Sequence, residues 1–171
     1  MNDPRTHKLI KECRRQEESC LYTSTTLYIW LREARWWRGF IIVVPIVLGG
    51  LASWSVLDRP DVEWAIWLTA TAGLLAGILP AVREALDLDL HVNEIARHAS
   101  QFKNLQDRFR LAADTGEHKS GDAFEAEIRD LMERLDEARK ASVTPPERCF
   151  VKASKKIKAG HYNFSVDEQE N

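Results

Sequence analysis

Residues 39–57 read GFIIVVPIVLGGLASWSVL and residues 64–82 read WAIWLTATAGLLAGILPAV, with only DRPDVE at residues 58–63 between them. Neither stretch contains an ionisable side chain. A helix of such length is about 28 Å long, close to the ~30 Å hydrocarbon thickness of a bilayer. A core helix of a soluble protein keeps one polar face, and these stretches have none. We therefore expect an all-α membrane protein built on a two-transmembrane helical hairpin at residues 39–82.

Basic residues around the two stretches predict their orientation. Five arginines flank the hairpin at its outer ends, whereas the loop at residues 58–63 has one, Arg59. By the positive-inside rule, both ends of the chain are expected in the cytoplasm, as in a multi-pass membrane protein. Because 38 residues with eight basic and five acidic side chains precede the first stretch, we do not expect a cleaved signal peptide. The expected anchors at the inner interface are Arg32, Arg35, Trp36, Trp37, Arg38 and Arg83.

Small residues recur every four positions within both stretches. Such stripes let helix backbones approach closely, either within the hairpin or between subunits, and they also suit the lining of a narrow pore. Both uses remain open. Because one hairpin cannot enclose a pathway and no charge lies inside it, conduction would require several copies. The residues expected in helix packing or pore lining are Pro45, Gly49, Ser53, Thr69, Gly73 and Gly77.

The rest of the chain is expected to be helical and cytoplasmic. We expect an N-terminal helix at residues 1–38, a helical region at residues 83–162 whose first helix continues unbroken from the second stretch, and a flexible tail at residues 163–171. Asp122 and Glu125 have the spacing of a capping box at a helix start. A heptad seam is expected to join subunits into an oligomeric helical bundle, and it consists of Leu88, Ile95, Phe102 and Phe109.

Three sets of polar side chains are candidate binding sites. His91, Glu94 and His98 share a helix face, but their spacing matches no established metal motif, so a polar layer is the preferred interpretation and a metal site the weaker one. Three cysteines in a cytoplasmic region are expected to be free thiols. A basic segment contains Lys152, Lys155, Lys156 and Lys158. It is compatible with a solvated helix face, with binding to anionic lipid or with binding to an anionic nucleotide.

No nucleophile, phosphate-loop or cofactor signature is present in the sequence, so we expect neither an enzyme nor a cofactor. The net charge of −2 averages a membrane segment and a charged cytoplasmic part, and therefore says little about partners.

The whole layout resembles a known family. A helical segment ends in YIWLREARWWR at residues 28–38, a tight hairpin follows, then a long helix with His91 and His98, a second cytoplasmic helix, and KAGHY at residues 158–162. This is similar to the SLATT proteins, the two-transmembrane effectors associated with SMODS nucleotidyltransferases and SLOG sensor domains in bacterial conflict systems. The resemblance covers nearly the entire chain through its architecture and diffuse motifs, and it assigns no catalytic residue.

The resemblance implies a pore-forming effector of antiphage defence by abortive infection. Such a protein would form a homo-oligomer in the bacterial inner membrane and permeabilise it when triggered. The chain carries no recognisable sensor domain, so the signal would come from a separate nucleotidyltransferase, SLOG protein or reverse transcriptase, or from a nucleotide messenger. The alternative hypothesis is a non-conducting, membrane-anchored scaffold that recruits a cytoplasmic partner through its helical bundle.

Overall fold

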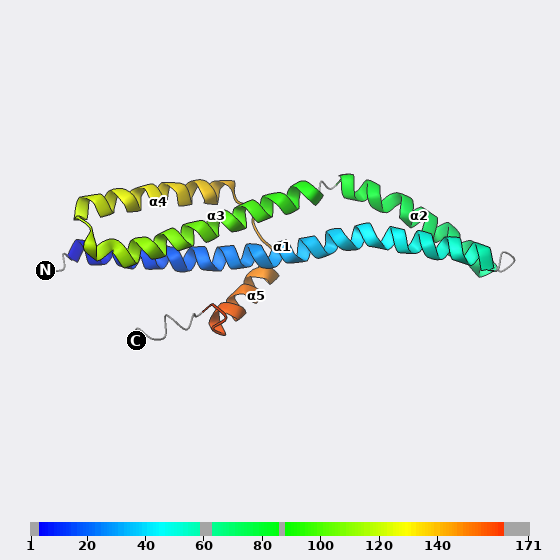
Figure 1. The fold of residues 1–171 in the computed structure, drawn as a ribbon, viewed down its shortest axis with the longest axis horizontal. Coiled ribbons are helices and arrows are strands. Elements are labelled where there is room, and N and C mark those ends of the chain that lie inside the picture. Colours follow the sequence, from blue (N-terminus) through cyan, green and yellow to red (C-terminus); the bar gives the residue numbers. More distant parts are fainter. Residues whose placement is uncertain (1–3, 59–62, 86–87, 163–171) are drawn as a thin grey trace. The chain divides into compact units, whose positions relative to one another are not determined.

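The computed structural model describes residues 4–58, 63–85 and 88–162, without the side chains of residues 52–58, 63–65, 68, 83, 85 and 88–90. Figure 1 shows its helices, which are α1 (Pro4–Asp58), α2 (Glu63–Ala85), α3 (Leu88–Thr115), the 3₁₀ turn η1 (Gly116–His118), α4 (Gly121–Ala141) and α5 (Glu147–Lys158). No strand occurs in these ranges, so the all-α expectation is confirmed. The flexible tail and the residues at 86–87, where an unbroken helix was expected, lie outside the described residues.

The chain divides into two compact units. The bundle unit combines the chain up to Leu31 with the chain from Glu94 onward, and the hairpin unit runs from Arg32 to Asn93. α1 belongs to both units, because it continues as one helix through the predicted boundary at residue 38 and past Pro45. The N-terminal helix and the first apolar stretch are therefore parts of one helix.

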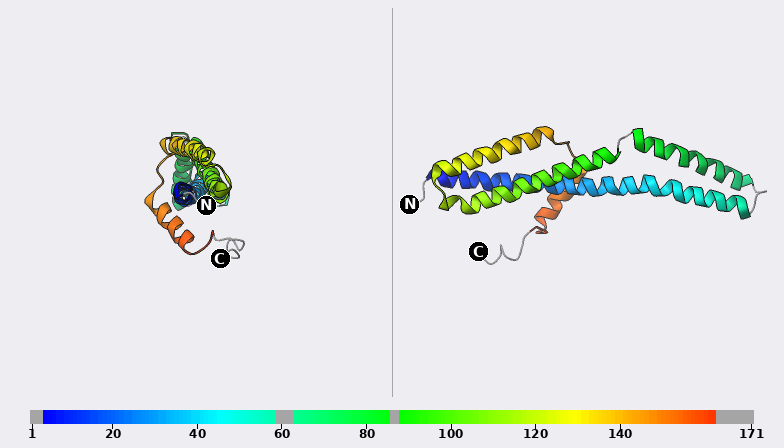
Figure 2. Two further views of the ribbon diagram at one scale, coloured as in Figure 1. Left: turned by 90° about the vertical axis from the view of Figure 1, so that its left-hand side faces the viewer. Right: turned by 45° about the horizontal axis from the view of Figure 1, so that its top comes forward.

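Three helices of the bundle unit pack side by side, as the views in Figure 2 show. Arg14 of α1 pairs with Asp114 at the end of α3, with 2.6 Å between Nη2 and Oδ1, so these helices run antiparallel. Arg5 pairs with Glu125 near the start of α4, and Arg139 near its end donates to Gln16 Oε1 of α1 at 3.1 Å. α4 therefore runs parallel to α1 and antiparallel to α3.

The core of the bundle unit comes from one apolar stripe on each helix. α4 buries all five residues that its sequence periodicity indicates, and α1 buries two cysteines at heptad spacing together with Leu27 and Leu31. The buried residues of α4 are Phe124, Ile128, Leu131, Leu135 and Ala138. Such burial of apolar side chains is the main stabilising contribution to the fold.

The heptad seam on α3 lies in this same core. Ile95, Phe102 and Phe109 are at most 2% exposed in a single chain, whereas the side chain of Leu88 lies outside the described residues. α3 does need partner helices, as its pattern indicated, but α1 and α4 of its own chain supply them. The seam that we expected to join subunits is thus filled within one chain, because the long N-terminal helix carries a matching stripe.

The reversal between α3 and α4 requires a glycine. A Cβ atom built on Gly116 would lie 2.6 Å from Cζ of Phe124 and 3.1 Å from Cγ1 of Ile10. Both distances are shorter than ordinary carbon contacts, so only a residue without a side chain lets the η1 backbone lie against the core.

α5 packs on α1 near Ile29, close to Leu31, where the bundle unit's share of α1 ends. Its Cys149 and Ala153 are fully buried and form a small cluster with Ile29, against which Trp30 also packs. α5 ends at Lys158, and Gly160 follows it with a φ of 77° that suits glycine. The amides of Gly160 and His161 donate to the carbonyls of Ile157 and Lys156, the pattern of a Schellman cap.

The hairpin unit consists of the C-terminal part of α1 and of α2, which returns beside it in Figures 1 and 2. By length and composition, one described helix, Pro4–Leu51 within α1, contains an apolar segment suited to crossing a membrane. The described apolar stretch of α2, Thr69–Val82, is shorter. Residues 59–62, most of the predicted outer loop, lie outside the described residues.

Candidate membrane-contacting surface and bundle groove

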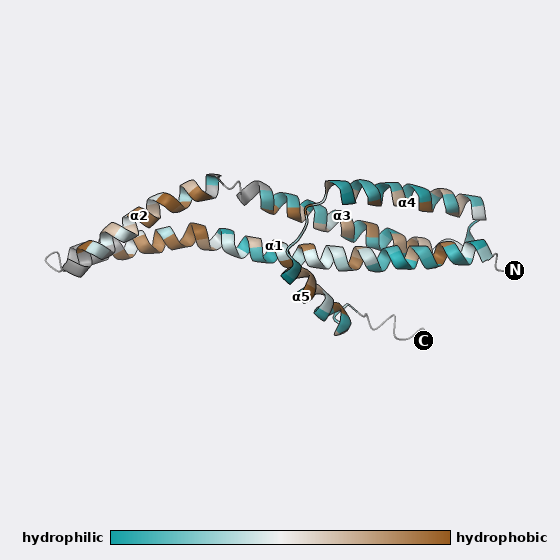
Figure 3. Cartoon of the chain, turned by 180° about the vertical axis from the view of Figure 1, so that it is seen from behind, coloured by the Kyte–Doolittle hydropathy of each residue, from teal (hydrophilic) through white to brown (hydrophobic). Residues whose placement is uncertain are grey.

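Large apolar side chains of the hairpin unit are exposed rather than buried. Figure 3 shows many hydrophobic residues on the coloured parts of α2 and of the C-terminal half of α1. Ile46 is 70% exposed, Trp67 73% and Leu74 64%, and no part of the apolar window of α1 is buried. Soluble monomers rarely expose contiguous apolar patches of more than a few hundred Å². We refer to the exposed apolar side chains of residues 40–51 and 66–82 as the apolar surface.

The predicted small-residue stripes differ in exposure. In α2, the less exposed face contains Thr69, Ala72 and Ala76, whereas Gly73 and Gly77 are exposed. A Cβ on either glycine would meet no described atom within 4 Å. The GxxxG element is therefore not used for close packing among the described residues of this chain.

The stripe on α1 is arranged differently. Pro45 and Gly49 are only partly exposed, on the side of α1 that also holds Ile41 and Leu48. The side chain of Ser53 lies outside the described residues. Pro45 and Gly49 are thus less exposed than Gly73 and Gly77, a difference that the spacing of four could not indicate because it fixes only which residues of one helix lie together.

Aromatic residues gather where the apolar surface begins. The ring centroids of Trp36 and Phe40 lie 5.5 Å apart in a stacked arrangement, and Trp37 contacts both rings edge-on. Trp36 is 62% exposed and Trp37 53%, and Arg32 and Arg35, just before them in the sequence, are exposed as well. An exposed aromatic cluster beside arginines is typical of residues at a membrane–water interface. The side chain of Arg83 lies outside the described residues.

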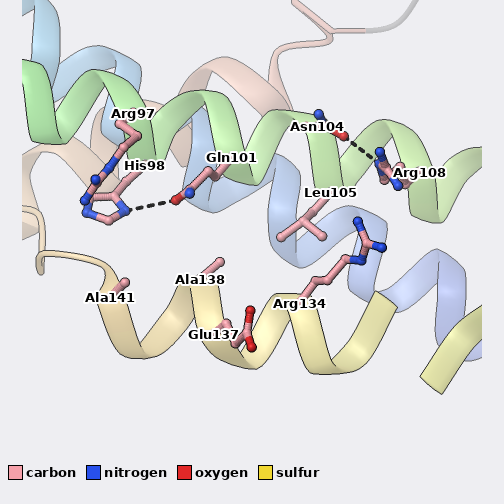
Figure 4. Close-up of a pocket in the computed structure, with 10 residues that line it drawn as sticks. All are labelled: Arg97, His98, Gln101, Asn104, Leu105, Arg108, Arg134, Glu137, Ala138 and Ala141. Atoms are coloured by element: carbon pink, nitrogen blue, oxygen red, sulfur yellow. Dashed lines mark hydrogen bonds between the residues drawn. The ribbon is translucent and has the colours of Figure 1, made fainter. Parts of the chain in front are cut away.

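A groove of about 490 Å³ lies between α3 and α4 within the bundle unit. Figure 4 shows its side chains, which come from both helices and are mostly polar. We call it the bundle groove. It is lined by Arg97, His98, Gln101, Asn104, Leu105, Arg108, Arg134, Glu137, Ala138 and Ala141.

Hydrogen bonds hold several of the groove's polar side chains in place. His98 is buried, with its Nδ1 3.2 Å from Oε1 of Gln101. Arg108 donates from Nε to Oδ1 of Asn104 at 2.8 Å. Arg134 forms an exposed ion pair with Asp130, with 2.8 Å between Nε and Oδ2. Three guanidinium groups and one carboxylate therefore line the groove, which favours an anionic occupant.

Sequence reasoning did not identify the bundle groove. Arg97, Gln101, Asn104 and Arg108 follow one another at steps of four, three and four, so they form a polar stripe beside the heptad seam. That stripe was the available signal. Its significance depends on the facing helix, because Arg134 comes from α4 and no local pattern predicts which face α4 turns toward α3.

The structure places the three candidate sets of histidine, lysine and cysteine side chains in different surroundings. Among the described residues no group of three His, Cys, Asp or Glu side chains could hold a metal, and His91 and Glu94 are exposed while His98 is buried. The basic segment lies on α5, where Lys152, Lys155 and Lys158 are exposed and Lys156 is partly exposed. These lysines do not line the bundle groove.

The cysteines are free and buried. Burial and, to a smaller extent, the charges of Glu127 and Glu12 together raise the pKa of the Cys13 thiol to about 11, against the lowering effect of the nearby Arg14. Burial also raises the pKa of the Cys20 thiol to about 11. Both thiols are therefore protonated and unreactive at neutral pH, as structural cysteines are.

The apolar surface and the bundle groove call for different kinds of contact. The first offers area without hydrogen-bonding groups, and the second offers fixed donors and positive charge. No protein-family model matches the chain, and no curated protein or solved structure matches it either.

Proposed function

We propose that this protein is a pore-forming membrane effector of a bacterial antiphage system that acts by abortive infection. In this proposal the hairpin unit spans the inner membrane twice, with both chain ends in the cytoplasm. Several copies assemble and permeabilise the membrane when a partner sensor or a nucleotide signal triggers them. The bundle unit is the cytoplasmic part that receives the signal.

The apolar surface is the observation that supports this proposal. Residues 40–51 and 66–82 expose large apolar side chains on both helices of the hairpin unit, and no ionisable residue interrupts either stretch. Lipid tails can cover such a surface without a specific protein partner. The helices form their backbone hydrogen bonds internally, as a membrane requires. The aromatic cluster at Trp36 and Trp37 supports an interface at the start of the first span.

The outward position of the GxxxG element supports assembly through the hairpin units. Gly73 and Gly77 leave open space beside α2 that another helix can enter. The bundle unit, in contrast, buries its heptad seam internally. We therefore assign the contacts between subunits to α2 rather than to Ile95, Phe102 and Phe109.

Two matched leucine substitutions test membrane insertion. Leu74 on α2 and Leu111 on α3 are 64% and 61% exposed. Leu74→Arg should reduce the share of the protein that stays in carbonate-washed membranes, because an arginine near the middle of a span costs about 2.5–3.5 kcal/mol on insertion. Leu111→Arg should leave it in the membrane fraction. If both variants behave alike, the apolar surface does not face lipid.

Membrane potential tests the pore itself. The protein is produced in a bacterium with its neighbouring genes, and a potential-sensitive dye is followed during phage infection. The proposal expects depolarisation with the wild type and Leu111→Arg, and none with Leu74→Arg. An inserted, oligomeric protein that never depolarises the cell would favour the membrane-anchored scaffold instead.

A further inference from the structure

We infer that the bundle groove binds a nucleotide, with its phosphate between Arg108 and Arg134 and its base against the middle of the groove. Of the residues that line the groove, His98 alone belongs to a candidate site predicted from the sequence. The site stands independently of pore formation, since binding can be measured without conductance.

The phosphate position follows from the convergence of like charges. Arg108 comes from α3 and Arg134 from α4, and their guanidinium groups extend toward the same end of the groove in Figure 4. Two facing guanidinium groups repel each other unless an anion lies between them. A guanidinium fork matches the oxygens of a phosphate in two parallel hydrogen bonds, which a lysine cannot form.

The existing partners of these arginines leave room for a ligand. Arg134 pairs with Asp130, but the two side chains are 51% and 55% exposed, and such ion pairs are weak in water. Among the described residues, the hydrogen bonding of Arg108 uses only its Nε, which donates to Asn104. Both terminal amino groups of Arg108 therefore stay available for an incoming oxyanion.

The middle of the groove has the chemistry that a nucleobase requires. Gln101 and Asn104 carry amides that both donate and accept hydrogen bonds, and Leu105 and Ala138 provide an apolar floor. Gln101 and Arg108 are seven residues apart on α3, which corresponds to about 10 Å along the helix. That span is about the length of a nucleoside monophosphate, and the groove volume of about 490 Å³ lies in the usual range for small-molecule sites.

Titration calorimetry on the full-length protein in a non-ionic detergent tests the inference. The probes are AMP, GMP, CMP and UMP, with ribose 5-phosphate and adenosine as the separate halves. At least one nucleotide should bind more tightly than either half. Arg108→Gln and Arg134→Gln should each weaken its binding about tenfold or more, as expected for loss of a charge-assisted hydrogen bond.

Two further variants make the test specific. Glu137→Gln removes the one carboxylate that lines the groove and should tighten binding about threefold, through loss of charge repulsion across several ångströms of water. Arg129→Gln removes the same charge from α4 outside the groove and should change nothing. Helical circular dichroism should be unchanged in all four variants, because the substituted side chains are exposed.

Three results would overturn the inference. Absence of binding by every nucleotide at millimolar concentration would exclude the site. Equal losses from Arg129→Gln and Arg134→Gln would show that net charge alone attracts the anion. Ribose 5-phosphate binding as tightly as the best nucleotide would overturn the assignment of the base to Gln101 and Asn104.

Discussion

Replacement of Gly116 by alanine tests the turn on which the bundle unit depends. The new Cβ would lie 2.6 Å from Cζ and 2.9 Å from Cε1 of the Phe124 ring, and 3.1 Å from Cγ1 of Ile10. Favourable carbon contacts lie at about 3.5–4.0 Å, so close to 1 Å of space must be found. Phe124 is fully buried, and its ring cannot move out into solvent.

The expected cost is that of overpacking a core, about 1–3 kcal/mol. Alanine also restricts the unfolded chain, which offsets about 0.4–1 kcal/mol of that cost. We therefore expect Gly116→Ala to lower the free energy of unfolding by about 1–2 kcal/mol. Gly121→Ala is the matched control, because its Cβ would meet no described atom within 4 Å in the first turn of α4. It should be neutral or slightly stabilising.

Thermal and urea unfolding of the full-length protein in detergent, followed by circular dichroism, measure the difference. Gly116→Ala should unfold at a lower temperature and urea concentration than Gly121→Ala. Adding Phe124→Leu to Gly116→Ala should recover part of the lost stability, because leucine leaves room for the new Cβ. A double-mutant cycle isolates that coupling. If Gly116→Ala is as stable as Gly121→Ala, the close approach at η1 does not constrain the fold.

Two other predictions concern assembly and thiol chemistry. Gly73→Leu meets no described neighbour within 4 Å, so the chain should fold while cross-linked oligomers and depolarisation are lost; unchanged cross-linking would remove the glycine stripe from the interface. The pKa values of Cys13 and Cys20 rise from 9.0 to about 11 on folding, so their stabilising contribution is complete below pH 9 and lost between pH 9 and 11. Stability should fall there by at most about 3 kcal/mol per thiol, and Cys13→Ala with Cys20→Ala should flatten the curve of unfolding free energy against pH.

Local periodicity was sufficient to predict the helices and their buried faces. The face of α4 that contains Phe124 and Leu135 is buried as its spacing indicates, and Gly160 follows the end of α5. These features depend on residues within one or two turns of each other. The same reasoning predicted a capping box from Asp122 and Glu125, and this was wrong: α4 begins at Gly121 after Ser120, whose side chain makes no capping bond. Glu125 instead pairs with Arg5.

Local sequence patterns could not predict which distant segments of the chain pack together. The seven-residue spacing of Ile95, Phe102 and Phe109 indicates that α3 needs partners, but it is equally compatible with partners from another chain. The choice depends on α1, whose cysteine stripe is thinner than a usual core and is nevertheless buried. The bundle groove was missed for the same reason, since Arg108 and Arg134 become one site only when α3 and α4 face each other.

The division of the bundle unit between the two ends of the chain has a consequence for biosynthesis. The residues up to Leu31 leave the ribosome first, but their partners begin at Glu94, after the whole hairpin unit. Cys13, Cys20 and Leu27 thus stay without their core until both apolar stretches have been translated. Translation of both apolar stretches therefore precedes completion of the bundle, and the nascent N-terminal helix is exposed to chaperones or to premature association during that interval.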